Sequence, residues 1–295
     1  MFLKKICLIV IAALTLLVTD LKALPVGNPL DATWLCNGLV WEGSCYEPCD
    51  PCLCWQDTWS FRFGYYGDFV FNRYMEVDNH HNRPAIRHTE LFTNAAYLAF
   101  NVWDRFDVFA SLGDSTLRIQ TPGSAFFLNT DDDPNNNVLN IELNTHFSWS
   151  IGGRATLWEC GCFGFGAEAQ YFSYKSKVNY VDNAFETPLY LSDAGTKYHE
   201  YQFGIGATYQ IPIAGCGTFV VPYFAVKWAH AKLDMGNFLL IDNEGDLVEL
   251  FHLHNQRTTG VAIGLTLVGC RVWSLTAEAR YIDELALHIN SQIRF

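Results

Sequence analysis

The chain has 295 residues, of which 50% are hydrophobic, 15% aromatic and only 17% charged, and its net charge at pH 7 is −12. So acidic a chain is not expected to bind nucleic acid or anionic lipid headgroups, because both are recognised mainly through clustered Lys and Arg. After the amino-terminal region no apolar run reaches the length of about eighteen residues that a spanning helix requires, which excludes a helical membrane protein. Alternating apolar and polar residues in β-strands would explain the mean hydropathy of +0.06.

Residues 1–23 are predicted to be a secretory signal peptide. Lys4 and Lys5 precede an apolar run over residues 6–18, and Ala23 supplies a small residue before the expected cleavage. The apolar run is shorter than the roughly twenty residues of a spanning helix. We therefore expect an exported protein, whose mature chain holds 16 basic and 30 acidic residues.

Residues 24–57 are expected to form a cysteine-rich periplasmic segment ahead of the first strand. The mature chain has nine cysteines, and an odd number in an oxidising compartment leaves at least one thiol free or paired with another molecule. The Cys49-Asp-Pro-Cys52 spacing would also suit zinc or a redox pair, but no second ligand pair matches it, so neither a metal nor a cofactor is expected. The disulfide candidates are Cys36, Cys45, Cys49, Cys52 and Cys54 in this segment, and Cys160, Cys162, Cys216 and Cys270 in short turns further on.

Alternation with a period of two begins at Trp59 and recurs along the rest of the chain. From Trp59 to Phe71 the odd positions are mostly aromatic, whereas Ser60 and Arg62 are among the even ones. Each such segment predicts a strand with one apolar and one polar face. Similar segments lie at 141–151, 163–171, 201–211, 261–267, 273–281 and 285–295, and less regular ones at 90–103, 106–113 and 218–232.

The connections between these strands alternate between short and long. Short ones fall near residues 104–105, 158–162, 212–217 and 269–271, and long polar ones near 75–89, 114–139, 178–197 and 233–255. This pattern is typical of an antiparallel up-and-down barrel of the outer membrane, with short turns on the periplasmic side. A lipocalin-like or sandwich fold would also alternate, but the aromatic excess favours a transmembrane barrel, whose interfacial girdles are rich in Trp and Tyr. The sequence thus predicts an all-β transmembrane barrel of about 10–16 strands over residues 58–295.

The last strand, Leu285–Phe295, ends the chain on an aromatic residue. We expect it to close the barrel by pairing with the strand from Trp59 to Phe71, and Phe295 to act in the signal that the insertion machinery recognises. Its polar face belongs to the predicted lumen.

The even positions of the strands would line a polar lumen. Inward glycines such as Gly164 and Gly166 would either leave space there or relieve the curvature of a narrow barrel. Opposed charges could set a weak cation selectivity, or could pair across the interior and plug it; the strand number decides, because about eight strands are filled by their own side chains. The lumen candidates are Arg62, Asp68, Arg105, Asp107, Glu142, Glu168, Glu200, Glu278, Arg280 and Arg294.

Several motifs resemble the chlamydial major outer membrane protein family of porins. They are Leu24–Pro29, Trp41–Gly43, Pro48–Cys52, Gly64–Phe71, Trp103–Phe109 and His288–Phe295, which follow one another from end to end of the mature chain. The resemblance implies a shorter, divergent member of that family: a porin that is cross-linked by disulfides into the outer envelope.

Three functions follow as hypotheses for an integral protein of the bacterial outer membrane. The leading one is a porin that passes ions and small hydrophilic solutes by passive diffusion, without cofactor or catalysis. The alternative is a largely closed structural barrel, whose partners are outer-membrane lipid and disulfide-linked envelope proteins or a second copy. A hydrolase built on His199-Glu200 at the outer rim comes third, because one dipeptide is a weak signal.

Overall fold

A computed structural model gives the arrangement of the strands. It describes residues 27–36, 59–78, 86, 88–122, 138–183, 195–213, 217–236, 239–241, 247–249 and 252–295. The predicted signal peptide lies outside these residues, as does most of the cysteine-rich segment.

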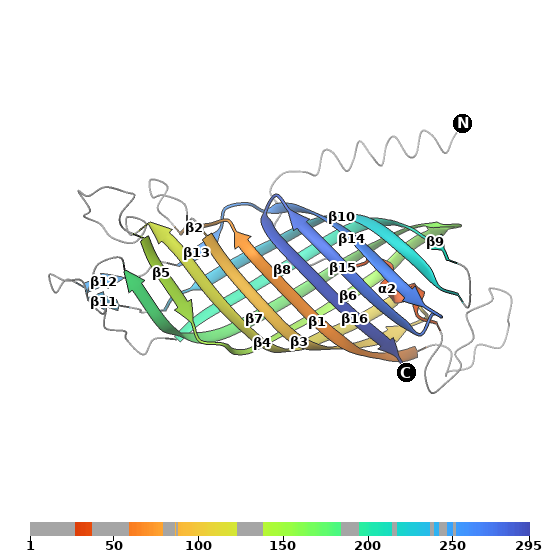
Figure 1. Ribbon diagram of the computed structural model, residues 1–295, viewed down its shortest axis with the longest axis horizontal. Coiled ribbons are helices and arrows are strands. Elements are labelled where there is room, and N and C mark those ends of the chain that lie inside the picture. The colour runs from red at the N-terminus through yellow and green to blue at the C-terminus, as the bar shows by residue number, and fades with distance from the viewer. Residues whose placement is uncertain are drawn as a thin grey trace.

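Ten antiparallel strands form a ring, in which each strand pairs with the next one around it (Figure 1). Pairing of β16 with β1 and of β10 with β14 completes the circle, which confirms both the predicted barrel and the predicted partner of the last strand. In chain order the ring consists of β1 (Trp59–Arg73), β3 (His88–Val102), β4 (Phe106–Pro122), β6 (His146–Cys160), β7 (Phe163–Asn183), β8 (Gly195–Tyr209), β10 (Phe219–Asp234), β14 (Thr259–Gly269), β15 (Trp273–Tyr281) and β16 (Glu284–Arg294).

Tight turns gather at one end of the barrel, which we call the short-turn end. Between β3 and β4, Trp103 and Asp104 have φ of 57° and 48°, and between β14 and β15, Cys270 and Arg271 have φ of 48° and 58°. Positive φ at both central residues is the type I′ pattern, whose twist matches that of the flanking strands. The carboxy-terminal Phe295 lies at the same end, where its backbone N–H donates to the carbonyl of Phe61.

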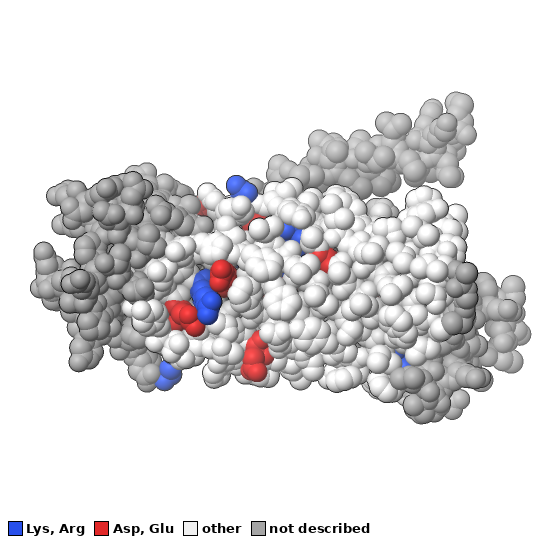
Figure 2. All heavy atoms as spheres, viewed as in Figure 1, with Lys and Arg blue, Asp and Glu red and all other residues white. Residues whose placement is uncertain are grey.

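The middle of the barrel is apolar outside and polar inside. On β1, Phe61 and Phe63 are 51% and 50% exposed, whereas Ser60 and Arg62 between them are buried. Figure 2 shows a mostly white surface over the middle of the barrel. This arrangement is the reverse of a soluble core and is that of a barrel surrounded by lipid. Among the described residues no helix is long and apolar enough to span a membrane.

Towards the opposite, long-connection end, the inner face of the barrel becomes apolar and the outer face becomes polar. On β4, Leu117 and Ile119 are buried inside, while Arg118 and Gln120 point outward. Lipid does not accommodate such an outer face, so this part of the barrel extends beyond the apolar belt.

The ring also narrows at the long-connection end. β13 (Leu253–Asn255) precedes β14 and pairs with β2 (Met75–Val77), which follows β1, so the two meet beyond the β15–β16 hairpin. Eight segments then surround the interior, namely β2, β3, β4, β5 (Val138–Leu143), β7, β8, β10 and β13. Outside this ring β9 (Ile211–Pro212) pairs with β10, and β11 (Leu239–Ile241) pairs with β12 (Leu247–Glu249).

Side chains fill this narrowed part, as expected for about eight strands. They form one buried apolar cluster, which we call the outer core. Its members are Val70, Met75, Val77, Ile86, Leu91, Leu117, Ile119, Leu139, Ile141, Leu143, Phe172, Tyr174, Val181, Tyr198, Ala231, Leu233, Met235, Leu253 and Ala286.

Candidate functional site

The interior of the barrel is the candidate site, and a piece of the amino-terminal segment occupies its short-turn end. This piece, residues 27–36, includes the short helix α2 (Asp31–Trp34), which lies within the ring in Figure 1. Arg62 on β1 donates to the carbonyl oxygens of Asp31 and Ala32, both at 2.8 Å. We call residues 27–36 the inner segment; they are part of the segment 24–57 for which the sequence predicts a periplasmic position, and they lie inside the short-turn end of the barrel.

The Asp31 carboxylate holds the inner segment to the wall. Its Oδ2 lies 3.0 Å from Arg154 Nη1 on β6 and accepts from Gln292 Nε2 on β16 at 2.9 Å. At one end of the segment the Asn28 side chain donates to Thr266 Oγ1 at 2.9 Å, and at the other Arg294 donates to the carbonyl of Leu35. Contacts to the wall on several sides therefore fix the segment across the lumen.

Glycines in the wall make room for the inner segment. A Cβ at Gly164 would lie 2.0 Å from Leu30 Cδ2, and one at Gly166 would lie 2.1 Å from the carbonyl oxygen of Pro29. No side chain fits at such distances without displacement of its neighbour. One of the two expectations for the inward glycines was that they leave space in the lumen. Gly164 and Gly166 do leave space, and residues of the same chain fill it.

Apolar contacts complete the closure at this end. Leu30, Trp34 and Leu35 form a buried cluster with Phe219, Val221 and Val268 of the wall. The rings of Trp34 and Phe219 meet edge to face, with centroids 5.2 Å apart.

Ion pairs bridge the barrel between the inner segment and the outer core. Arg73 on β1 contacts both Glu200 on β8 and Glu284 on β16. Because β8 is opposite β1 in the ring, the Arg73–Glu200 pair spans the interior. Lys227 on β10 reaches the same region, 2.6 Å from Glu284 Oε1 and 3.4 Å from Asp283 Oδ2.

Further ion pairs join other inward charges. Arg280 contacts Asp68 and lies 3.0 Å from Glu284 Oε1. Closer to the inner segment, two pairs link neighbouring parts of the wall, Arg62 with Asp107 at 3.0 Å and Arg154 with Glu168 at 2.6 Å. Buried charges are tolerated in this way only when each meets an opposite charge and hydrogen-bond partners.

Most of the sequence-predicted lumen residues lie inside the ring. Those with buried inward positions are Arg62, Asp68, Asp107, Glu168, Glu200, Glu278, Arg280 and Arg294. Arg105 and Glu142 do not. Arg105 belongs to the β3–β4 turn, where it is exposed and pairs with Glu159 at 2.6 Å.

Glu142 was assigned to the wrong face because the alternation is interrupted. The strand formed by β5 and β6 contains an extra residue near Asn144, where β4 residues 118 and 115 face 142 and 146. A one-residue shift moves every following side chain to the other face. Glu142 therefore points outward and pairs with Arg118 at 3.2 Å, although Ser148 further along is buried inside.

Sequence reasoning missed several of the charged groups that bridge the interior. Arg154 on β6 and Lys227 on β10 fall at inward positions of the two-residue alternation, like the small residues two positions away, so the alternation predicts that both point inward. Arg73 and Glu284 lie at strand ends, where the phase is harder to assign. No pattern marked Asp31, because the inner segment has no periodicity of its own.

Comparison with known proteins gives the family. The family model described as Chlamydia major outer membrane protein matches residues 2–84, 81–190 and 243–295. The chain belongs to this family. It is 33% identical to a major outer membrane porin of Chlamydia pneumoniae, over 94% of this chain and 96% of that one. It is 32% identical to the serovar C major outer membrane porin of Chlamydia trachomatis, over 94% and 96%. Among solved structures, the β domain of the Bordetella autotransporter BrkA aligns with a TM-score of 0.41 at 10% identity, over 81% of this chain and 100% of that one.

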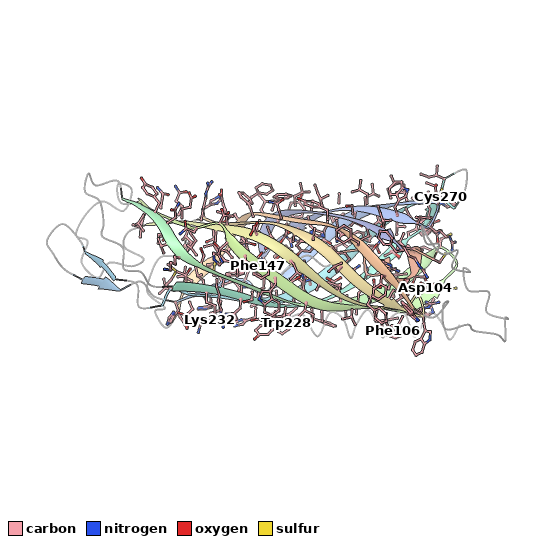
Figure 3. The ribbon with its side chains drawn as sticks, turned by 90° about the horizontal axis from the view of Figure 1, so that it is seen from below. Asp104, Phe106, Phe147, Trp228, Lys232 and Cys270 are labelled. Carbon is pink, nitrogen blue, oxygen red and sulfur yellow. The ribbon has the colours of Figure 1, made fainter. Side chains whose placement is uncertain are left out.

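In this chlamydial family member, the described cysteines fall into two groups. Cys36 and Cys270 are disulfide-bonded, whereas Cys160 and Cys162 are free and exposed beside the β6–β7 turn. Figure 3 places Cys270 at the same end as Asp104 and Phe106 of the β3–β4 hairpin. The other predicted disulfide candidates, Cys45, Cys49, Cys52, Cys54 and Cys216, lie outside the described residues.

The His199-Glu200 dipeptide does not form a catalytic pair. Neighbouring residues of a strand point to opposite faces. Glu200 is completely buried inside the barrel, and His199 is on the outer face of β8. Family membership likewise suggests a protein without catalytic activity.

Proposed function

We propose that the chain is a porin that passes ions and small hydrophilic solutes by passive diffusion. The observation that carries this proposal is the inside of the barrel, which is lined at membrane level by buried charged and polar side chains such as Asp68, Glu168 and Arg280. Burial of charged groups costs free energy unless they are paired or hydrated, so such groups serve either a structural ion-pair network or a water-filled path. The major outer membrane porins of the family support the second use.

Opening requires movement of the inner segment. In the conformation described, residues 27–36 close the short-turn end through hydrogen bonds that water could replace and through the apolar contacts of Leu30, Trp34 and Leu35. The Arg73–Glu200 and Arg73–Glu284 pairs close the middle, and they too are contacts that water and mobile ions could take over. We therefore expect a low conductance with brief openings.

Single-channel recording in planar bilayers tests the proposal. We expect discrete openings with a preference for cations, because the inward acids outnumber the inward bases. The acids are Asp31, Asp68, Asp107, Glu168, Glu200, Glu278, Asp283 and Glu284, and the bases are Arg62, Arg73, Arg154, Lys227, Arg280 and Arg294. A KCl gradient would show the preference as a shift of the reversal potential. A correctly folded protein without any openings would contradict the porin proposal.

The second candidate is a closed structural barrel. The ion pair between opposite walls, Arg73 with Glu200, favours it, since it blocks the interior without help from the inner segment. Liposome swelling separates the candidates: a closed barrel admits no sugar or amino acid under any condition.

We also propose that the free thiols Cys160 and Cys162 join the protein to neighbouring envelope proteins or to a second copy. Both are exposed, and thiolates attack disulfides only where they are accessible. Replacement of both by Ser should remove disulfide-linked oligomers from non-reducing gels. A variant with Cys45 and Cys49 replaced by Ser is run beside it. If only this second variant loses the oligomers, the intermolecular disulfide is formed by residues 24–57 instead.

The same proposal places the short-turn end in the periplasm, where disulfides form. Phe295 at that end would then face the insertion machinery, and Phe295→Ala should slow assembly into the membrane without changing the conductance of molecules that insert.

A further inference from the structure

The wall of the barrel is incompletely paired where the β15–β16 hairpin ends. β1 pairs with β16 as far as Arg73 and Glu284. On the other side of the hairpin, the pairing of β10 with β14 ends at Trp228, and its pairing with β13 begins only at Lys232. The hairpin stops well short of the long-connection end in Figure 1. The backbone pairing is therefore interrupted between the tip of this hairpin and the β13–β14 connection, and we call this place the wall break.

The Arg257 side chain bridges the wall break. It extends from the β13–β14 connection, and its Nη1 donates to the carbonyl oxygen of Ile282 at the hairpin tip, at 2.8 Å. Its guanidinium also lies over the ring of Tyr74, with 4.0 Å from Cζ to the centroid. Arg257 is exposed, so water competes for both contacts and each contributes little to stability. Among the described residues, the bridge is thus a flexible side chain that can turn aside while the strands stay in place.

The turn next to Arg257 has a strained backbone. Ile282 has φ of 86° at the first of the two residues between β15 and β16, where a turn with positive φ normally contains glycine. A β-branched residue rarely adopts this conformation, and Ile282 is 55% exposed, so contacts with the rest of the protein do little to impose it. The next residue, Asp283, turns into the barrel and is buried. Backbone strain of this kind is found mainly at functional sites.

The ion-pair network of the interior lies directly behind the wall break. Asp283 Oδ2 is 3.4 Å from Nζ of Lys227, which also contacts Glu284 at 2.6 Å. The other oxygen, Asp283 Oδ1, has no hydrogen-bond partner among the described residues, and a Cβ at Gly260 would lie 1.9 Å from it. A buried carboxylate oxygen without a partner costs free energy unless water or a cation reaches it. The hairpin tip thus holds a polar group that suits a hydrated path.

The wall break lies at the edge of the apolar belt. On its short-turn side, Tyr281 and Leu285 are 46% and 47% exposed on the outside. On its long-connection side, Gln256 and Arg257 are exposed polar residues. An opening here leads from the interior to the headgroup region rather than to the acyl chains.

The outer core obstructs the direct way out of the barrel. Leu233 and Leu253, which belong to it, pair with each other beyond the wall break, nearer the long-connection end, and both are completely buried. An ion or a sugar loses its hydration in such an apolar constriction, which makes the passage unfavourable. The wall break lies on the near side of these side chains.

We propose that the wall break is a side exit from the barrel, with Arg257 as its gate. Ions and small hydrophilic solutes pass the inner segment, reach the ion-pair network and leave between Arg257 and the hairpin tip, without crossing the outer core. This exit rests on the porin function proposed above. It gives that function a path which leaves the apolar closure of the long-connection end intact.

Chemical blocking at position 257 in single-channel recordings tests the exit. The starting chain carries Cys160→Ser and Cys162→Ser, so that the exposed thiols beside the β6–β7 turn do not react. Arg257→Cys is added, and sulfonatoethyl methanethiosulfonate then attaches an anionic group at the gate. We expect most of the single-channel current to be lost, and mass spectrometry of the recovered protein verifies that the thiol has reacted.

Arg118→Cys in the same starting chain is the matched control. Arg118 is 53% exposed on β4, also outside the barrel and beyond the apolar belt, so its modification should leave the current unchanged. Arg257→Glu and Arg118→Glu extend the comparison, because a charge at the exit acts on every passing ion. Only Arg257→Glu should shift the reversal potential in a KCl gradient towards greater cation selectivity.

The possible failures are distinguishable. Current that is unchanged after reaction at position 257 overturns the exit and leaves the porin function standing, because the solutes then cross the outer core. Equal losses for Arg257→Cys and Arg118→Cys also overturn the exit, since the reagent then acts on the barrel as a whole. Absence of openings in every variant contradicts the porin function, and the exit with it.

Discussion

The two ends of the barrel interior are closed in opposite ways. At the long-connection end the wall itself fills the space with apolar side chains such as Phe172 and Tyr198, which are nearly inaccessible to solvent. At the short-turn end a separate stretch of chain, residues 27–36, fills a space that wall glycines leave open. The barrel wall itself makes the first closure, whereas the second is made by a separate segment of the same chain that binds inside the barrel.

The difference lies in what each closure would cost to open. Separation of the outer core exposes apolar surface to water at about 25 cal/mol for each Å². Release of the inner segment exchanges hydrogen bonds such as Arg62 to Asp31 for hydrogen bonds to water, whose net worth is about 0.5–1.5 kcal/mol each, and it exposes a smaller apolar cluster, that of Leu30, Trp34 and Leu35 with the wall. If the barrel conducts, the inner segment is the closure that moves first.

The largest effect is expected from Phe172→Ala in the outer core. Phe172 is 2% exposed and meets Tyr198 edge to face at 5.9 Å, so its loss leaves a cavity that the narrow ring cannot collapse to fill. The free energy of unfolding should fall by about 3–5 kcal/mol, measured by urea unfolding in lipid vesicles. Phe147→Ala is the control, because Phe147 is 51% exposed on the outside and lipid chains can occupy its place. Equal losses in the two variants would contradict a dry outer core.

A smaller effect on stability, but a large one on conductance, is expected from Gly164→Val. The new side chain takes the place of Leu30, so the part of the inner segment around Leu30 should leave its site. Overpacking of this kind costs about 1–3 kcal/mol, and single-channel recordings should show longer openings. Gly195→Val is the matched control, since a Cβ there meets nothing within 4 Å. Unchanged openings, with residues 27–36 still protected from protease, would show that the segment tolerates the valine and would contradict its tight fit.

A weaker, pH-dependent effect is expected from Asp31. Burial raises the pKa of this carboxyl above its ordinary value of about 3.8, although Arg154 and Arg62 oppose the rise and Asp107 adds to it. The seated segment therefore binds a proton more tightly than the released one, and its seating is favoured below the raised pKa and weakened as the pH rises through it. Openings should become rarer as the pH falls from 7 towards 4. The same pH profile in Asp31→Asn would assign the effect to another group.

The sequence was sufficient to predict the ring, because lipid outside and polar groups inside force a period of two on every strand. The terminal strand could be paired with Trp59–Phe71 because a barrel leaves no free edge, so the first and last predicted strands must meet. The extra residue near Asn144 could not be foreseen, and it reversed the assignment of Glu142. The inner segment was equally hidden: its place depends on glycines 130 or more residues away, such as Gly164 and Gly166, and no local pattern in residues 27–36 records that contact.

The smallest effect is expected from Glu142→Gln, which separates ion pairs outside the barrel from those inside. The side chains of Arg118 and Glu142 are 53% and 36% exposed, so water screens their attraction and its loss should change the free energy of unfolding by only about 0–1 kcal/mol. Glu168→Gln is the inside counterpart: it leaves Arg154 buried with one charged partner, Asp31, instead of two, and loss of a buried partner costs about 1–3 kcal/mol. Urea unfolding of both variants in the same vesicles measures the difference. If Glu168→Gln were as mild as Glu142→Gln, water would already reach Arg154, and the interior beside the inner segment would be wet before the segment moves.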